Sequence, residues 1–188
     1  DEMRRRHDFV HEQGGTCVMV NLIAAGMAGM IALGHHTNLP IHAHRAGWGA
    51  LTREPMLGWS YPAWSKLWRL AGADHMHVSG LDNKFTEPNE SVIESARSLN
   101  DPLFSHAPMS ALPVFSSGQT VRQAAATLEA VGSSDFLVAA GGGIVAHPGG
   151  VAAGVKAMRQ AYDAAMQKVD VAEYAEDHPE LAAALDEF

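Results

Sequence analysis

Two short apolar runs end in small polar or glycine residues: Leu112-Pro113-Val114-Phe115-Ser116-Ser117-Gly118-Gln119 and Phe136-Leu137-Val138-Ala139-Ala140-Gly141-Gly142-Gly143. Each run has the length and composition of a buried parallel strand, and a helix-like segment follows it. Three earlier runs show the same order, over residues 16–20, 40–44 and 73–78. Strand and helix therefore alternate five times, which is typical of parallel βα units.

This alternation predicts an α/β fold that forms the C-terminal half of a (β/α)₈ TIM barrel, about strands 4 to 8. A complete barrel takes roughly 250 residues, and this chain has 188. We expect residues 1–168 to form the partial barrel and residues 169–188 to form an acidic helical tail. Such barrels carry their chemistry at the C-terminal ends of the strands, and commonly bind phosphate with the loops after the last two.

The composition excludes several classes of function. Hydrophobic residues make up 47% of the chain and charged residues 18%, which fits a folded α/β protein and argues against disorder. The net charge of −8 gives no basic footprint for nucleic acid. No apolar stretch reaches the roughly 20 residues that a membrane-spanning helix needs. We therefore expect no nucleic-acid or membrane partner, and a local site for a small anion.

Cys17 is the one cysteine, so the chain cannot form an internal disulfide. This favours a reducing compartment, and we expect a cytoplasmic protein. Because Cys17 lies in an apolar, strand-like run, we interpret it as an inert core thiol rather than a nucleophile.

The second strand-like run ends in His42-Ala43-His44-Arg45. His42 and His44 share one face of the strand. Such a pair can bind a metal, but metal hydrolases of this kind also need a carboxylate or histidines on other strands, and the last strand here ends in glycines. We therefore interpret His42 as a core histidine that holds a neighbouring loop. Arg45 suits bidentate contact with a phosphate or carboxylate, and a salt bridge to a loop acid is the alternative.

The third run ends in Asp74-His75-Met76-His77, and Lys84 lies in the loop that follows. His77 is nearest the strand end, where it could contact phosphate or exchange protons, whereas Asp74 fits a structural position at the start. Glycine and turn-forming residues make the loop over 79–89 a candidate mobile lid. Lys84 could close with it over an anionic substrate, and an ordinary solvated lysine is the alternative.

The two final loops supply a candidate phosphate site. Ser116, Ser117 and Gly118 precede one helix-like segment, and Gly141 and Gly142 precede another. Glycines let backbone N–H groups approach a phosphate, and helix N-termini attract anions. Tight turns in a crowded barrel are the competing explanation.

Four segments match one known family in order, spacing and residue type. They are Ile41-His42-Ala43-His44-Arg45-Ala46; Gly72-Ala73-Asp74-His75-Met76-His77, with Lys84 seven residues later; Leu112-Pro113-Val114-Phe115-Ser116-Ser117-Gly118; and Ala140-Gly141-Gly142-Gly143-Ile144-Val145-Ala146-His147-Pro148-Gly149. From about residue 15 to residue 165 the chain resembles the C-terminal half of the RuBisCO large-chain superfamily.

The resemblance implies a role for each matching residue. His44 and Lys84 would be catalytic, His44 near the reacting carbons and Lys84 on the mobile loop, where it stabilises a carboxylate. Arg45 and His77 would hold one phosphate of the sugar. The other matches would contact substrate oxygens or a second phosphate: Ser116, Ser117, Gly118, Gly141 and Gly142.

Some positions depart from the carboxylases. Trp48 stands where they have a second histidine, Ser117-Gly118 where they have a glycine pair, and Val20-Asn21 where they have His-Asp. These changes favour a RuBisCO-like protein that performs enolate chemistry on another phosphorylated keto-sugar or sugar acid, by decarboxylation, transcarboxylation or carboxylation. The alternatives are an enolase or isomerase of a phosphorylated ketose, as in methionine salvage, and an inactive half-barrel fragment.

The resemblance also implies Mg²⁺, bound through a carbamylated lysine and two acids on the second strand of the family's barrel. Nothing in this sequence resembles that segment, so we expect no metal ligands in this chain. We expect the first half of the barrel and a homodimer to complete the site, and the isolated chain to be inactive.

Overall fold

The computed structural model describes residues 1–188 except Pro55 and Leu57. The predicted end of the loop after the second strand, at Pro55, lies outside the described residues. Five strands form one sheet in sequence order, and the pairs β1–β2, β2–β3 and β4–β5 are parallel, as predicted. Their bounds are β1 Val18–Asn21, β2 Ile41–His44, β3 His75–Ser79, β4 Leu112–Phe115 and β5 Leu137–Val138.

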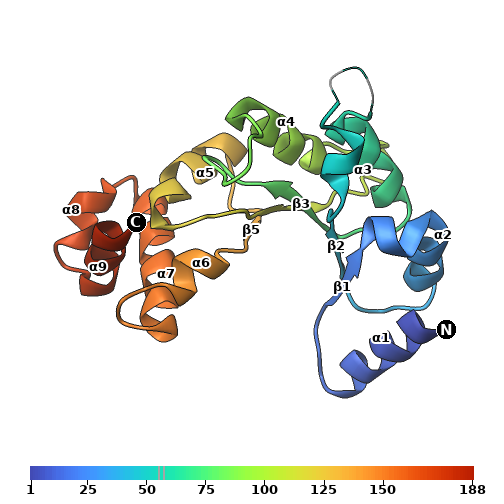
Figure 1. Ribbon diagram of the computed structural model, residues 1–188, viewed down its shortest axis with the longest axis horizontal. Helices are drawn as coiled ribbons and strands as arrows, with labels where there is room; N and C mark the ends of the chain where they lie inside the picture. Colours follow the sequence, from blue (N-terminus) through green and yellow to red (C-terminus); the bar gives the residue numbers. More distant parts are fainter. Residues whose placement is uncertain (55, 57) are drawn as a thin grey trace. The chain divides into compact units, whose positions relative to one another are not determined.

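Helices precede β1 and follow each strand (Figure 1). They are α1 Glu2–Glu12, α2 Leu22–Gly34, α3 Tyr61–Leu70, α4 Asn89–Asn100, α5 Ala124–Val131, α6 Gly141–Val145, α7 Val151–Gln167, α8 Val171–Ala175 and α9 Pro179–Glu187, with 3₁₀ helices η1 Trp48–Leu51 and η2 Val121–Gln123. Among the described residues, no helix is both long enough and apolar enough to cross a membrane.

The chain divides into two compact units. The first unit comprises Asp1–His77 and Arg97–Pro113, and the second comprises Val78–Ala96 and Val114–Phe188. The two units are interleaved along the sequence, since the chain passes from the first to the second, back to the first, and then to the second again.

In the first unit, a buried arginine joins α3 to the last turn of α4 and to the segment that follows it. Arg69 is 1% exposed, and its guanidinium donates to the carbonyls of Ser98 and Met109 at 2.7 Å each. A buried cation is tolerated only where its donors are satisfied. Arg69 therefore fixes the chain after α4 against α3, which also buries Trp64 and Trp68.

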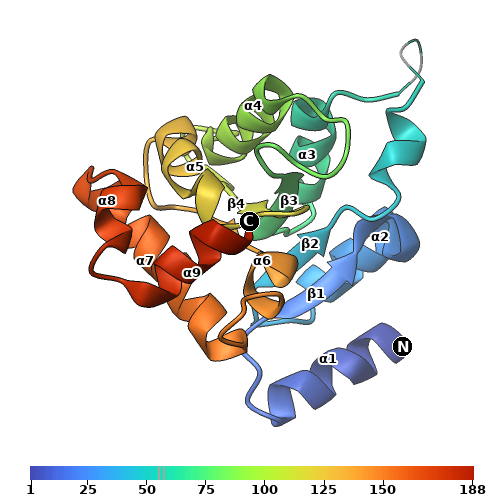
Figure 2. The ribbon, with the colours of Figure 1, turned by 60° about the vertical axis from the view of Figure 1, so that its left-hand side comes forward.

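In the second unit, α7, α8 and α9 lie side by side (Figures 1 and 2). Ala157 and Ala161 of α7 pack in one apolar cluster with Leu181 and Ala184 of α9, and each is at most 1% exposed. Residues four apart lie on one face of a helix, so the alanines give α7 a smooth surface for its neighbours. The predicted division of the chain at residue 168 stays a prediction.

Two predicted segments differ in detail. The helix predicted over 121–131 begins as η2, because Thr120 and Gln123 form a capping box, in which the Thr120 N–H donates to Oε1 of Gln123 at 2.9 Å. The glycine triplet predicted as a loop instead starts α6, where the N–H of Ile144 donates to the carbonyl of Ala140 at 2.9 Å. Glycine is a weak helix former, so composition alone does not reveal this helix.

Candidate functional site

In the first unit, Arg45 and His77 are linked through Tyr61. Arg45 directly follows β2, and its guanidinium carbon lies 5.2 Å from the centre of the Tyr61 ring. The Tyr61 hydroxyl donates to the carbonyl of His77 on β3 at 2.6 Å. Because Tyr61 is 5% exposed, its rigid ring positions both the cation and the strand.

Trp48 also packs against Tyr61. The two rings are 5.5 Å apart and nearly perpendicular, at 89°, and Trp48 also lies 4.6 Å from the ring of Trp64. These are favourable geometries for buried aromatic pairs. The position that carries a histidine in the carboxylases therefore holds an apolar support for Tyr61 in this chain.

His42, His44 and His77 form a compact imidazole group. The Nε2 atoms of His42 and His77 are 2.7 Å apart, and the rings of His44 and His77 are 4.5 Å apart. His42 thus contacts a histidine of the next strand, and its predicted role in holding a loop stays a prediction. The N–H of Ala46 donates to Nδ1 of His44 at 3.0 Å, so a neutral His44 carries its proton on Nε2 and offers an N–H donor there.

Burial keeps His77 uncharged near neutral pH. Desolvation, together with repulsion from His42, His44 and Arg45, lowers the pKa of His77 from 6.5 to about 3. A neutral imidazole can donate or accept one hydrogen bond, but it brings no charge to a phosphate. Arg45 therefore supplies the fixed positive charge of this group.

In the second unit, the loop after β3 is fastened to the loop after β4. The N–H of Lys84 donates to the carbonyl of Ser117 at 2.9 Å. The buried side chain of Gln119 donates through Nε2 to the carbonyl of Leu81, also at 2.9 Å. The ammonium of Lys84 lies 5.6 Å from the centre of the exposed Phe85 ring. The loop predicted as a lid is thus anchored at its backbone, and its mobility stays a prediction.

The turn after β4 has an uncommon backbone. Ser117 has a φ of 68° and Gly118 a φ of 97°. A left-handed serine is held only where its surroundings fix it, and such residues cluster at functional sites. Here the carbonyl of Ser117 is bound by Lys84, and the N–H of Ser116 donates to the carbonyl of Ser79 at 2.7 Å.

The glycine triplet lies against the same turn. A Cβ atom on Gly143 would fall 2.5 Å from the carbonyl oxygen of Gln119, so the close approach of the two segments requires glycine there. Around Gly141 and Gly142, by contrast, a Cβ atom would meet nothing within 4 Å. The first N–H groups of a helix have no acceptor within it. The N–H groups of Gly141 and Gly142 are among these, and the positions of these two residues leave room for a side chain.

The structure thus groups the predicted residues in two sets. The first unit brings together His44, Arg45 and His77. In the second unit Lys84 is bonded to Ser117, and Gly143 packs against Gln119; the segments Ser116–Gly118 and Gly141–Gly142 are called the glycine turns. Sequence reasoning missed Tyr61 and Gln119. The position of Tyr61, an aromatic residue at a predicted helix start, could have drawn attention to it. Nothing in the sequence marks Gln119, because a polar residue after glycine is typical of an exposed turn.

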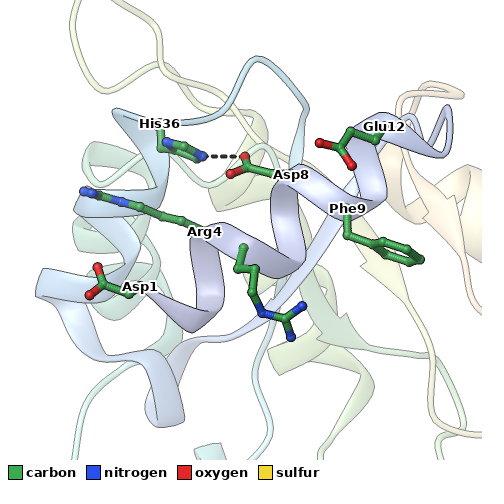
Figure 3. Close-up of a pocket in the computed structure, with 7 residues that line it drawn as sticks. Asp1, Arg4, Asp8, Phe9, Glu12 and His36 are labelled. Carbon is green, nitrogen blue, oxygen red and sulfur yellow. Dashed lines mark hydrogen bonds and ion pairs between the residues drawn. The ribbon is translucent and has the colours of Figure 1, made fainter.

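None of these residues lines the hollow along α1 that Figure 3 shows. Nε2 of His36 lies 2.6 Å from the carboxylate of Asp8 within it. The remaining lining residues are all exposed and include both charges and one aromatic ring: Asp1, Arg4, Arg5, Phe9 and Glu12. Exposed ion pairs of this kind are ordinary features of a solvated surface.

The described residues do not suit the Mg²⁺ ion that the resemblance implies. Mg²⁺ prefers oxygen ligands in octahedral geometry. Among the described residues, the groups of three side chains that could share an ion are Cys17-His42-His75 and His7-Asp8-His36, which contain one carboxylate between them.

Comparison with known proteins places these observations in a family. Residues 1–188 match the family described as ribulose bisphosphate carboxylase large chain, catalytic domain. A 3-oxo-isoapionate-4-phosphate transcarboxylase/hydrolase of Xanthobacter autotrophicus is 58% identical over 98% of this chain and 45% of that protein. A 3-oxo-isoapionate-4-phosphate decarboxylase of Rhizobium rhizogenes is 46% identical over 100% of this chain and 45% of that protein.

The fold is similarly matched by a solved structure. A rubisco-like protein from Burkholderia fungorum has a TM-score of 0.95 at 46% identity, over 99% of this chain and 46% of that one. This likeness confirms the predicted α/β half-barrel. The chain spans about 45% of the length of the curated relatives described above.

Proposed function

The chain belongs to the RuBisCO large-chain family, and we propose that it is part of an enzyme that decarboxylates or transcarboxylates 3-oxo-isoapionate 4-phosphate or a closely related sugar-acid phosphate. The relatives that are 58% and 46% identical are named for reactions of that compound. In a 3-oxo acid, the electrons of the breaking C–C bond pass into the ketone, so the carboxyl group leaves as CO₂ and an enolate remains. An enzyme for this step must hold the phosphate, position the carboxylate for departure and stabilise the negative charge that develops on the enolate oxygen.

The grouping of Lys84 with the glycine turns carries this proposal. The turns offer the N–H groups of Gly141 and Gly142, which have no acceptor within α6. Lys84 adds a cation whose backbone N–H is bonded to Ser117 in the other turn. In the first unit, Arg45 offers a second cation for phosphate, and the Nε2–H of His44 offers a donor for a substrate oxygen. These groups suit an anionic substrate with a phosphate and a carboxylate.

The remaining parts of the enzyme would come from outside this chain. The proposal includes a Mg²⁺ ion held by residues of the other half of the barrel, a homodimer, and an isolated chain that is inactive. A cytoplasmic location belongs to the same proposal.

The test uses the full-length protein and 3-oxo-isoapionate 4-phosphate labelled with ¹³C at the carboxyl carbon. Decarboxylation releases labelled CO₂, whereas transcarboxylation keeps the label on an organic product. Lys84→Met should lower kcat by at least about 100-fold, the cost of losing one donor to a developing charge. Lys66→Met, which changes an exposed lysine of α3, is the matched control and should leave kcat unchanged.

Two results would contradict the proposal. One is full activity in Lys84→Met. The other is no reaction of the labelled compound together with isomerisation of phosphorylated ketoses, which would favour the enolase or isomerase alternative.

A further inference from the structure

Three side chains with metal-binding atoms meet in the first unit, outside the residues assigned to the substrate. One sulfur and two ring nitrogens, from Cys17, His42 and His75, all lie within 4.8 Å of one another. Cys17 directly precedes β1, His42 lies on β2, and His75 begins β3. In the register of the sheet, Met19 pairs with His42 and His42 pairs with His75. Since alternate residues share a face, the backbone directs all three side chains to one side of the sheet.

We propose that Cys17, His42 and His75 bind a zinc ion. Thiolate and imidazole are the ligands that Zn²⁺ prefers, and three protein ligands leave a fourth position for water or another small ligand. A tetrahedral zinc ion holds a sulfur and a ring nitrogen about 3.6 Å apart. Sγ of Cys17 and Nδ1 of His75 are 4.0 Å apart, so a small side-chain rotation brings them to that spacing.

The surroundings suit a bound cation. Metal-bound imidazoles usually keep an outer hydrogen-bond partner, and the 2.7 Å contact between His42 and His77 is of that kind. The negative charge of Asp74 interacts electrostatically with the Cys17 sulfur. Its Oδ2 atom accepts from the N–H of Ile41 at 2.7 Å, which holds the carboxylate in place. This charge would help to balance the ion.

The zinc ligands differ from the residues proposed to contact the substrate, and His42 touches that group through His77. The zinc site draws on the residue before β1 and the first residue of β3, whereas His44 and Arg45 lie at the opposite end of β2. Its ligands are sulfur and nitrogen, whereas Mg²⁺ takes oxygen. An ion at this point would fasten three neighbouring strand segments together.

Cobalt titration of the purified chain tests the site, because Co²⁺ replaces Zn²⁺ and gives a near-ultraviolet charge-transfer band when a thiolate binds it. Cys17 is the one cysteine of the chain, so such a band must involve it. We expect the band to saturate at one equivalent. Cys17→Ser should abolish the band, and His75→Gln should weaken the affinity at least about tenfold. His36→Gln, which alters the surface group with His7 and Asp8, is the matched control and should change neither.

The proposal is wrong if the parent chain shows no thiolate band, if His75→Gln leaves the affinity intact, or if His36→Gln removes the band. A second measurement needs no variant. Zinc should slow the alkylation of Cys17 by iodoacetamide at least about tenfold, and EDTA should restore the rate, because a metal-bound thiolate is shielded from the reagent. An alkylation rate that zinc does not change would also overturn the site.

Discussion

The two sets of candidate residues offer their binding groups in different ways. The first unit presents side chains, with Arg45 and the imidazoles positioned by the buried ring of Tyr61. The second unit presents mainly the backbone of the glycine turns, with Lys84 fastened to one of them. A side chain can be removed while its strand stays in place, whereas a backbone donor exists only while its turn keeps its shape. Truncation of a side chain that reaches the substrate should therefore act on binding, whereas a substitution that reshapes a glycine turn should act on folding.

Gly143→Ala, in the second unit, should have the largest effect on the stability of the chain. The added methyl group would meet the carbonyl oxygen of Gln119 at 2.5 Å, so we expect the free energy of unfolding to fall by about 2–3 kcal/mol, a typical cost of overpacking. Urea unfolding measures this. Gly142→Ala is the matched control, because its methyl group enters open space and should cost less than about 1 kcal/mol. Equal losses in both variants would refute the close approach.

In the first unit, the lowered pKa of His77 should make the free energy of unfolding depend on pH. The pKa of His77 is about 3 in the folded chain and 6.5 ordinarily, so between those values the unfolded chain binds a proton that the folded chain does not. Stability is therefore full above pH 6.5 and falls as the pH drops toward 3. From pH 7 to pH 5 we expect a loss of about 2 kcal/mol, measured by urea unfolding in EDTA.

His77→Gln provides the comparison for that measurement, because glutamine keeps a hydrogen-bonding group but does not titrate. The variant should lose much less stability than the parent chain between pH 7 and pH 5. Parallel pH profiles for the two proteins would show that His77 is not held neutral by its surroundings.

Tyr61→Phe separates the hydrogen bond of Tyr61 from its ring. The variant keeps the aromatic face near Arg45 but loses the 2.6 Å bond to the carbonyl of His77, so we expect a loss of about 1–1.5 kcal/mol in unfolding free energy. Tyr174→Phe removes a longer, exposed contact with Gln167 at 3.3 Å and should change stability by less than about 0.5 kcal/mol. A smaller effect at Tyr61 than at Tyr174 would contradict its positioning role.

Arg45→Lys tests the side-chain contribution of the first unit to binding, and it should have the smallest effect of these substitutions. Lysine keeps the charge but loses the planar, bidentate donor, so KM for the phosphorylated substrate of the full-length enzyme should rise about fivefold, equivalent to about 1 kcal/mol. kcat should be nearly unchanged. Arg159→Lys, at an exposed ion pair with Asp163, is the control and should leave KM as it is. An unchanged KM in Arg45→Lys would remove Arg45 from the phosphate site.

The sequence predicted the strands and their order because those signals are local. Each apolar run of a few residues is bounded by polar or glycine residues, as at Phe115 and Ser116. The sequence did not predict the bond between Lys84 and Ser117 or the contact of Cys17 with His75, since both depend on segments far apart in the chain. The neutral state of His77 was equally hidden, because burial by the folded chain produces it.

The buried guanidinium of Arg69 bears on how the chain is synthesised. Its acceptors at Ser98 and Met109 emerge from the ribosome after the first residues of the second unit, which begins at Val78. A nascent chain that ends before Ser98 holds a cation whose burial has no compensating acceptors there. The first unit therefore cannot be completed before the Val78–Ala96 part of the second has been made.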